Sequence, residues 1–319
     1  MKRFTNILLV CDEDSLHDAL IERAVWLAKA NGARITLVDV MESAPGELAS
    51  LFGSFSGAGA QDVEHEVIEF RSARLADIAG PIKSEGIQTA EVVLQGNPFI
   101  EIIRKVLRDE HDLVMKGAAG ASEGRSLFFA STDMHVLRKC PCPVWIMKNS
   151  PDRRNARILA AVDPDPANEQ KVGLNTLVME LATSLTEIDE SELHIMNTWR
   201  LEEEAALRNS AFAKVPKARI DKLVDEQEQK CQQNLSQLLF RYPDTSGKHE
   251  VHLEKGAARE IIPEFAEQNK VDLIVMGTVG RTGVSGLIIG NTAEAILNQV
   301  ECSVLAVKPP GFETPVKLH

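Results

Sequence analysis

The sequence has no excess of basic residues, and this absence bounds its partners. Its 35 Lys and Arg stand against 47 Asp and Glu, which gives a formal net charge of −12 at pH 7. Nonspecific affinity for nucleic acid comes mainly from neutralising phosphates with Lys and Arg. We therefore expect no direct DNA binding, although a local basic patch is compatible with this composition.

No segment near the N-terminus has the length of a membrane anchor. The apolar stretch that follows Met1-Lys2-Arg3 ends at Cys11-Asp12-Glu13. It is far shorter than a membrane span and lacks the long apolar core and cleavage site of a signal peptide. We expect a soluble, cytoplasmic protein without a membrane span.

Cysteines are few and odd in number. The five are Cys11, Cys140, Cys142, Cys231 and Cys302, and several lie in apolar, strand-like sequence. This is typical of reduced, buried thiols rather than of a disulfide framework, and it favours the cytosol. Cys140-Pro141-Cys142 could be a redox or metal pair, but it lacks CxxC spacing and a nearby His or Cys cluster, so we favour a structural role.

Motifs of common catalytic sites are also missing. The sequence has no GxxxxGK[ST] loop, no GxGxxG after its first predicted strand, and no histidine spacing such as HExxH. No lysine or general base can be assigned to ATP hydrolysis. We therefore expect a binding protein rather than an enzyme, with at most a weak ATPase side activity. Zinc catalysis is unsupported, and Mg²⁺ is expected only where a nucleotide brings it.

What the chain does contain is an internal duplication. The run from Asn6 to Asp12 resembles the run from Ala156 to Asp163, and Cys142 to Lys148 resembles Cys302 to Lys308. A repeat of roughly 150 residues is too long for a solenoid unit and has the size of an independently folded domain. We predict two domains, 1–150 and 151–319.

Short β-rich runs alternate with helical patterns, which predicts α/β domains with parallel sheets. In the first half we expect strands at 7–10, 34–40, 88–94, 113–115 and 144–147, and helices at 16–31, 63–84, 99–108 and from about 131. Right-handed crossovers favour a doubly wound, five-stranded sheet of order 3-2-1-4-5 in each domain. Ligands bind such sheets where the first and fourth strands diverge.

In the second half, the fourth strand runs into a glycine-rich segment. Gly277 and Gly280 follow the strand, and after nine further residues Gly290 precedes an apparent helix that begins with Asn291. Glycines let a ligand approach the main chain, and a helix start offers unpaired N–H groups to an anion. Asp163, at the end of the first strand, should face this segment. The arrangement predicts a nucleotide site; the alternative is that the glycines shape a turn and Asp163 caps a helix.

The spacing G-x2-G-x9-G over 277–290, the acid at the end of the first strand and the tandem layout resemble the universal stress protein family in its two-domain form. The resemblance implies binding of ATP or a related adenine nucleotide, with or without Mg²⁺, and a regulatory role in the stress response. It assigns nine positions: Asp163 and Thr198 at the base, Met276 and Gly277 at the ribose, and Gly280, Arg281, Gly290, Asn291 and Thr292 at the phosphates. Asn291 departs from the family's usual Ser or Thr.

The first half contains a degenerate copy of the motif. Its matching positions are Asp12, Gly117, Gly120, Ser131 and Thr132, and Ala130 replaces the third glycine. A Cβ at Ala130 would hinder close approach of a phosphate, and Asp12 together with Asp39 would oppose an anion. We expect this site to be weaker than the second, or empty.

A second hypothesis is an interaction module that binds a protein partner or an apolar, lipid-like ligand without nucleotide. It is motivated by Asn291, Ala130 and Asp39, and it would act through edge strands or through the segment 45–59, in which Leu51, Phe52 and Phe55 lie among glycines and serines. That segment could be a lid, an apolar contact, or a loop packed on its own domain.

The last strands of the two halves, 144–147 and 303–307, are expected to pair the domains as an intramolecular pseudo-dimer. A homodimer is compatible with the sequence, which identifies neither the protein partner nor the stress.

Overall fold

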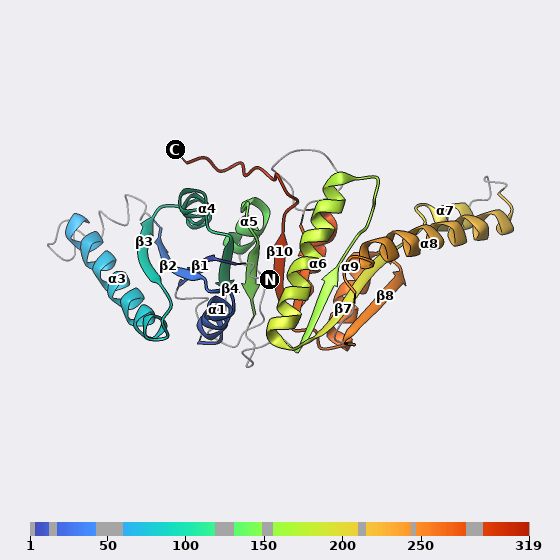
Figure 1. Cartoon of the computed structure of the whole chain (residues 1–319). Coiled ribbons are helices and arrows are strands. Elements are labelled where there is room, and N and C mark those ends of the chain that lie inside the picture. Colours follow the sequence, from blue (N-terminus) through green and yellow to red (C-terminus); the bar gives the residue numbers. More distant parts are fainter. Residues whose placement is uncertain are drawn as a thin grey trace. The chain divides into compact units, whose positions relative to one another are not determined.

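The computed structural model describes residues 4–12, 18–42, 60–118, 131–148, 156–209, 215–243, 247–278 and 290–318 (Figure 1). The chain divides near residue 153 into two compact units, and the C-terminal residues from Glu313 onward group with the first unit. Each unit is an α/β domain and is described separately below.

The first unit has a parallel sheet of five strands. They are β1 (Asn6–Val10), β2 (Arg34–Met41), β3 (Thr89–Gln95), β4 (Leu113–Gly117) and β5 (Val144–Met147), paired in the order β3-β2-β1-β4-β5. The helices are α1 (Asp18–Asn31), α3 (Ala60–Ser84), α4 (Pro98–Asp109) and α5 (Ser131–Lys139). Figure 1 shows α4 and α5 on one side of the strands and α1 on the other.

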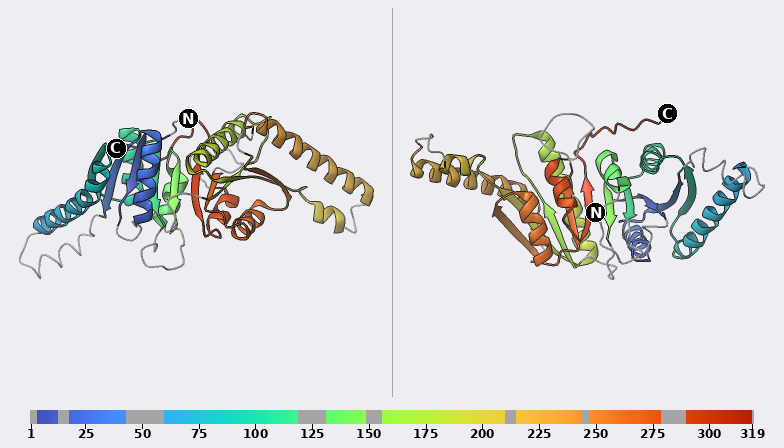
Figure 2. Two further views of the ribbon diagram at one scale, coloured as in Figure 1. Left: turned by 60° about the horizontal axis from the view of Figure 1, so that its bottom comes forward. Right: turned by 180° about the vertical axis from the view of Figure 1, so that it is seen from behind.

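The second unit repeats this plan. Its strands are β6 (Arg157–Ala161), β7 (Glu192–Trp199), β8 (His249–Lys255), β9 (Leu273–Gly277) and β10 (Ser303–Val307), all parallel, in the order β8-β7-β6-β9-β10. Its helices are α6 (Glu169–Asp189), α7 (Glu204–Asn209), α8 (Lys217–Leu239), α9 (Ala258–Gln268) and α10 (Asn291–Leu297). Figure 2 shows α9 and α10 side by side, in agreement with their mutual contacts.

The burial of the strands follows from this layering. Every residue of β1, β4, β5 and β10 is buried, as expected where helices cover both faces of a parallel sheet, whereas the edge strands β3 and β8 are largely exposed or half-buried. The predicted fold class, two tandem α/β domains with parallel sheets, is confirmed.

An aspartate fixes the start of the first strand in each unit. The Asp112 carboxylate accepts hydrogen bonds from the N–H groups of Thr5 and Asn6, at 2.7 and 3.0 Å. In the second unit Asp272 accepts from Ala156 and Arg157, at 2.7 and 2.9 Å. Both aspartates immediately precede the fourth strand of their unit, so the carboxylates tie neighbouring strands at their amino ends.

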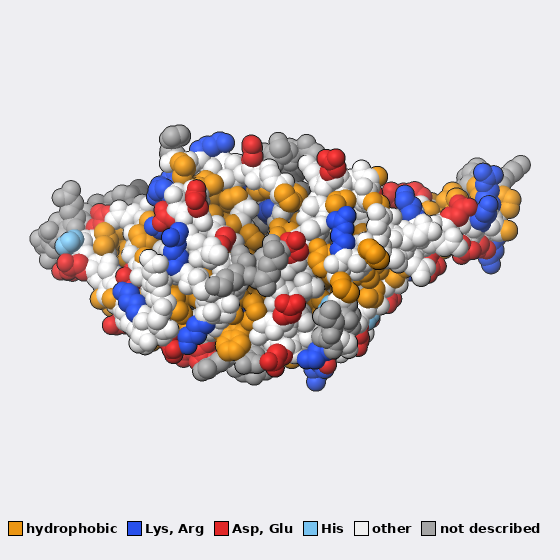
Figure 3. All heavy atoms as spheres, in the orientation of Figure 1, with side chains coloured by type: hydrophobic (Ala, Val, Ile, Leu, Met, Phe, Trp, Pro, Cys, Tyr) orange, Lys and Arg blue, Asp and Glu red, His pale blue; other side chains and the backbone are white. Residues whose placement is uncertain are grey.

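The described surface has charges of both signs. On the face drawn in Figure 3, basic and acidic side chains are interspersed rather than separated into large patches. Large exposed apolar side chains include Phe70 on α3 and Phe240 at the end of α8. Within the ranges given above, no helix combines the length and apolarity that crossing a bilayer would require.

Candidate functional site

The carboxyl ends of β6, β7 and β9 meet at one edge of the second sheet. The pairing register sets Ala161 of β6 opposite both Met196 of β7 and Met276 of β9. Asp163 and Thr198 each come two residues after this level, so both lie at the same edge. This is the position at which doubly wound sheets bind ligands, because the crossovers on either side leave a crevice there.

The start of α10 joins this edge through the main chain. The Gly290 N–H donates to the carbonyl of Thr278, the residue after β9, at 3.0 Å. Gly290 takes the N-cap position with φ −61° and ψ 138°, so Asn291 is the first helical residue and no side chain caps the helix. The first turn of α10, with Asn291 and Thr292, therefore begins beside the end of β9.

The conformation of Gly290 qualifies the sequence argument. Its φ and ψ lie in the β region that any residue can adopt, so this glycine is not required for a left-handed backbone. Gly290 still has no side chain to crowd a group that approaches the helix start.

Asp163 is held by its backbone while its carboxylate is accessible. Asn175 on α6 accepts the Asp163 N–H at 2.8 Å and donates to the Asp163 carbonyl at 3.0 Å. The carboxylate accepts from the Lys171 ammonium at 2.7 Å, and its side chain is 59% exposed. The helix cap is Asn168, whose side chain accepts the Lys171 N–H. The structure thus assigns the capping of α6 to Asn168 rather than to Asp163.

The end of β7 is tied to the end of β6. Asn197 donates from Nδ2 to the Val162 carbonyl at 2.9 Å, and Asn197 is buried. Thr198 is half-buried beside it, and Trp199 is buried with the Lys255 ammonium 5.5 Å from its ring centroid. An indole close to this edge provides an intrinsic probe of events there.

Gly277 has a structural reason that the sequence did not reveal. A Cβ added at this position would lie 2.5 Å from Cδ2 of Leu174 on α6, which is closer than real Cβ contacts come. A side chain at this position would therefore force Leu174 to shift, so glycine eases the packing of α6 against the sheet whether or not a ligand binds.

A buried cation also lies at this edge. Lys308, which follows β10, donates from Nζ to Oγ1 of the fully buried Thr278, and its ammonium lies 5.4 Å from the ring centroid of Phe312. In the sequence, Lys308 stands out only as the end of the repeated run from Cys302. A positive charge next to the end of β9 would favour an anion nearby.

The structure brings most of the predicted site residues of the second half together at this edge: Asp163, Thr198, Met276, Gly277, Gly290, Asn291 and Thr292. Gly280 and Arg281 lie outside the described residues, as do Gly120 and Ala130 of the first half and the segment 45–59.

The matching edge of the first unit is occupied by a lysine. Lys116, on β4 at the position that Met276 has in the second half, is 3% exposed and lies 3.0 Å from Asp12 and 2.9 Å from Asp133. Burial would lower the pKa of Lys116, but the two carboxylates outweigh it and raise that pKa above 10.5. Asp12, at the end of the first strand, thus already has a cationic partner within the protein.

Asp39 is paired as well. It is fully buried, with its carboxylate oxygens 2.8 Å from Arg71 and 3.5 Å from Arg74, and Arg74 also donates to the Cys11 carbonyl. Burial raises the pKa of Asp39, while the two guanidinium groups act in the opposite direction. In the second unit the matching residue is the neutral Asn197.

These pairs correct the sequence argument for the first half. Asp12 and Asp39 were expected to oppose an anionic ligand by their charge, but Lys116, Arg71 and Arg74 balance them. The edge of the first unit differs from that of the second because Asp12 and Asp39 already form ion pairs within the protein. This difference between the two edges could have been found in the sequence, because Lys116 stands in the first half where Met276 stands in the second.

Cys140 and Cys142 are free thiols with their sulfur atoms 3.5 Å apart, and Cys140 is buried.

The model of the universal stress protein family matches the chain twice, over residues 3–148 and 155–308. The whole chain is 29% identical to Universal stress protein E of Escherichia coli (strain K12) and covers 98% of that protein. With Universal stress protein E of Photorhabdus laumondii it shares 27% identity over 99% of both chains.

Solved structures share the fold over nearly the whole chain. A functionally unknown protein, PA1789 from Pseudomonas aeruginosa PAO1, superposes with a TM-score of 0.70 at 22% identity, covering 97% of this chain and 94% of that one. A universal stress protein from Archaeoglobus fulgidus gives 0.60 at 19% identity, covering 95% and 98%. With two copies of the family domain in tandem, the chain belongs to the universal stress protein family.

Proposed function

We propose that the second domain binds ATP or a related adenine nucleotide at the carboxyl ends of β6, β7 and β9, and that this binding regulates a response to stress. The observation that supports it best is the meeting of Asp163 and Thr198 with the start of α10, which the Gly290 N–H holds to Thr278. The stress-response role rests on the family and on the names of the relatives.

The accessible carboxylate of Asp163 would exchange Lys171 for a donor of the base or ribose. Met276 and Gly277 would border the ribose, and Gly280, Arg281, Gly290, Asn291 and Thr292 would surround the phosphates. Mg²⁺ would arrive with the nucleotide, since phosphate oxygens supply part of its octahedral shell. The buried Lys308 would add a favourable charge.

The first domain is proposed to bind nucleotide weakly or not at all. A ligand there would have to displace Lys116 from Asp12, and Lys116 is buried between Asp12 and Asp133. Breaking such a cluster leaves buried charge without compensation, which is costly.

We propose a binding protein rather than an enzyme. One segment, residues 120–124 (Gly-Ala-Ser-Glu-Gly), has the G-x-S-x-G pattern of the nucleophile elbow of hydrolases. In that elbow the serine stands on the turn that directly follows a strand, whereas β4 ends at Gly117, five residues before Ser122. The sequence pattern alone therefore gives no support for a hydrolase.

Calorimetric titration of Mg-ATP into full-length Gly290→Val tests the site. The β-region backbone of Gly290 accommodates valine, so the fold should be kept while the side chain crowds the phosphates. We expect affinity to fall by at least about tenfold, or 1.4 kcal/mol. Ala130→Val, which places the same residue at the matching position of the first half, is the control and should leave binding unchanged.

Unchanged affinity in Gly290→Val, with native circular dichroism, would contradict the site assignment. Equal loss in both variants would show that the first domain contributes to binding. The alternative hypothesis, an interaction module acting through 45–59, stays a prediction, because that segment lies outside the described residues.

A further inference from the structure

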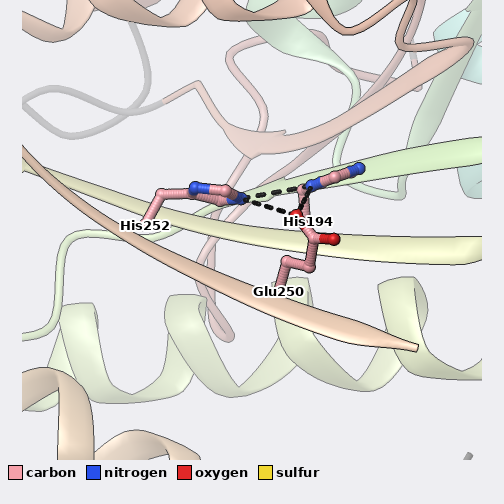
Figure 4. Close-up of side chains that lie close together, drawn as sticks. All are labelled: His194, Glu250 and His252. Carbon is pink, nitrogen blue, oxygen red and sulfur yellow. Dashed lines mark hydrogen bonds and ion pairs between the residues drawn. The ribbon is translucent and has the colours of Figure 1, made fainter. Parts of the chain in front are cut away.

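Two histidines and a glutamate converge on the last two strands of the second sheet, and none of them is among the residues assigned to the nucleotide site. His194 lies on β7, and Glu250 and His252 lie on the neighbouring edge strand β8 (Figure 4). The register pairs His194 with Glu250 and Met196 with His252. Because side chains alternate along a strand, Glu250 and His252 project from the same face, where His194 meets them.

The three potential ligand atoms form a compact triangle. Nδ1 of His194 lies 3.1 Å from Nε2 of His252 and 3.5 Å from Oε2 of Glu250, and the last two atoms are 3.9 Å apart. A circle through three atoms at these separations has a radius of about 2 Å, which matches Zn–N and Zn–O bond lengths. An ion near its centre would reach all three without rearrangement of the strands.

We propose that His194, Glu250 and His252 form a binding site for a divalent transition-metal ion, with zinc as the preferred occupant. Two imidazole nitrogens and one carboxylate suit zinc and its neighbours, whereas Mg²⁺ and Ca²⁺ prefer oxygen ligands alone. Three protein ligands leave a fourth position for water or another group.

The surroundings suit such a site. His194 is buried, and its Nε2 has no hydrogen-bond partner among the residues described. The polar contacts of this ring are therefore those that Nδ1 makes with His252 and Glu250. Phe265 of α9 covers the histidines, with ring centroids 5.5 Å from His194 and 4.6 Å from His252. The Glu250 side chain is 68% exposed and gives an ion access from solvent.

The two rings face each other through ring nitrogens, Nδ1 of His194 and Nε2 of His252, which lie 3.1 Å apart. A bound ion would replace the proton that bridges these nitrogens, because a ligating imidazole nitrogen must be unprotonated.

The consequence for the fold is local. The ion would tie the exposed edge strand β8 to β7, since each of the two strands supplies a ligand. Sequence spacing could not reveal the site, because His194 and His252 are 58 residues apart and meet only through strand pairing.

Zinc titration of the full-length protein against a chromophoric chelator tests the proposal. We expect one zinc ion per chain with a dissociation constant of about 1 µM or tighter. Glu250→Gln and His252→Gln should each weaken that binding by about 100-fold, since each removes a direct ligand. His249→Gln, on the same strand but on its opposite face, is the control and should bind as the parent does.

A second readout separates this site from zinc bound by cysteine thiolates. Cobalt bound by nitrogen and oxygen gives visible d–d bands without the strong ultraviolet charge-transfer band of a thiolate. Those bands should disappear in His252→Gln while circular dichroism stays native. Absence of zinc binding at about 100 µM, or binding that survives in both ligand variants, would overturn the proposal.

Discussion

Lys116→Met should destabilise the first domain strongly. The change introduces the residue found at the matching position of the second half and removes the ammonium 2.9 Å from Asp133, whose side chain is fully buried. Removing one partner of a buried ion pair costs about 3–5 kcal/mol, because the remaining charge cannot be hydrated. Asp12 is 34% exposed and can turn to water, so Asp133 accounts for most of the loss. We expect the free energy of unfolding to fall by about 4 kcal/mol.

The assay is urea unfolding followed by tryptophan fluorescence in a Trp199→Phe background. The remaining indoles, Trp26 on α1 and Trp145 on β5, both belong to the first unit and report its unfolding. With a slope of about 2 kcal/mol per molar urea, the expected loss moves the midpoint down by about 2 M.

The double variant Lys116→Met/Asp133→Asn is the matched control. It replaces the pair by uncharged groups of similar size, and such replacements are often close to neutral, so most of the lost stability should return. A midpoint for Lys116→Met within about 0.3 M of the parent would refute the importance of the buried cluster.

Three further predictions follow from single sites. Gly277→Ala should lower the free energy of unfolding by about 1–3 kcal/mol, and a second change, Leu174→Ala, should partly relieve this loss. Gly290→Ala should change the free energy of unfolding by no more than about 0.5 kcal/mol. Equal losses in denaturant unfolding of Gly277→Ala and Gly290→Ala would contradict the role of Leu174. Burial lowers the pKa of His111 below 6.5, so the unfolded chain binds a proton first as pH falls, and stability should decrease below pH 6.5; His111→Gln should flatten that slope, and an unaltered slope would exclude His111. Burial raises the pKa of the Cys11 thiol to about 12, so iodoacetamide at about pH 8 should label Cys11 only after unfolding, as peptide mass spectrometry would show.

The fold could be predicted because its signals are local or repeated. The buried run Val144–Met147 reads as a strand, and the structure gives that strand the same bounds. Pro98, in the first turn of α4, marks a helix start from sequence alone. The duplication adds a second copy of each pattern, so a strand or helix predicted in one half supports the matching prediction in the other half.

The contacts that shape the candidate site were less accessible, because they join residues far apart in the sequence. Asn6 and Asp112, which fix the start of β1, are separated by 106 positions. The close contact that a side chain at position 277 would make is with Leu174, on another element. A sequence pattern can mark such residues as unusual, but the partner that explains them appears only in the folded chain.

Charge was the least predictable property of the site. Asp12 and Asp39 read as repulsive in sequence, yet each lies beside a lysine or arginine in the structure. A carboxylate's effect on a ligand depends on whether another group already neutralises it, and that requires three-dimensional placement.

Native mass spectrometry of gently purified full-length protein, with and without millimolar Mg-ATP, tests the central proposal most directly. It reports how many nucleotides each chain binds and which small molecules remain after purification. We expect one adenine nucleotide per chain, bound by the second domain and less populated in Gly290→Val. Two nucleotides per chain would contradict the closed first-domain site, and none at millimolar concentration would contradict nucleotide binding altogether.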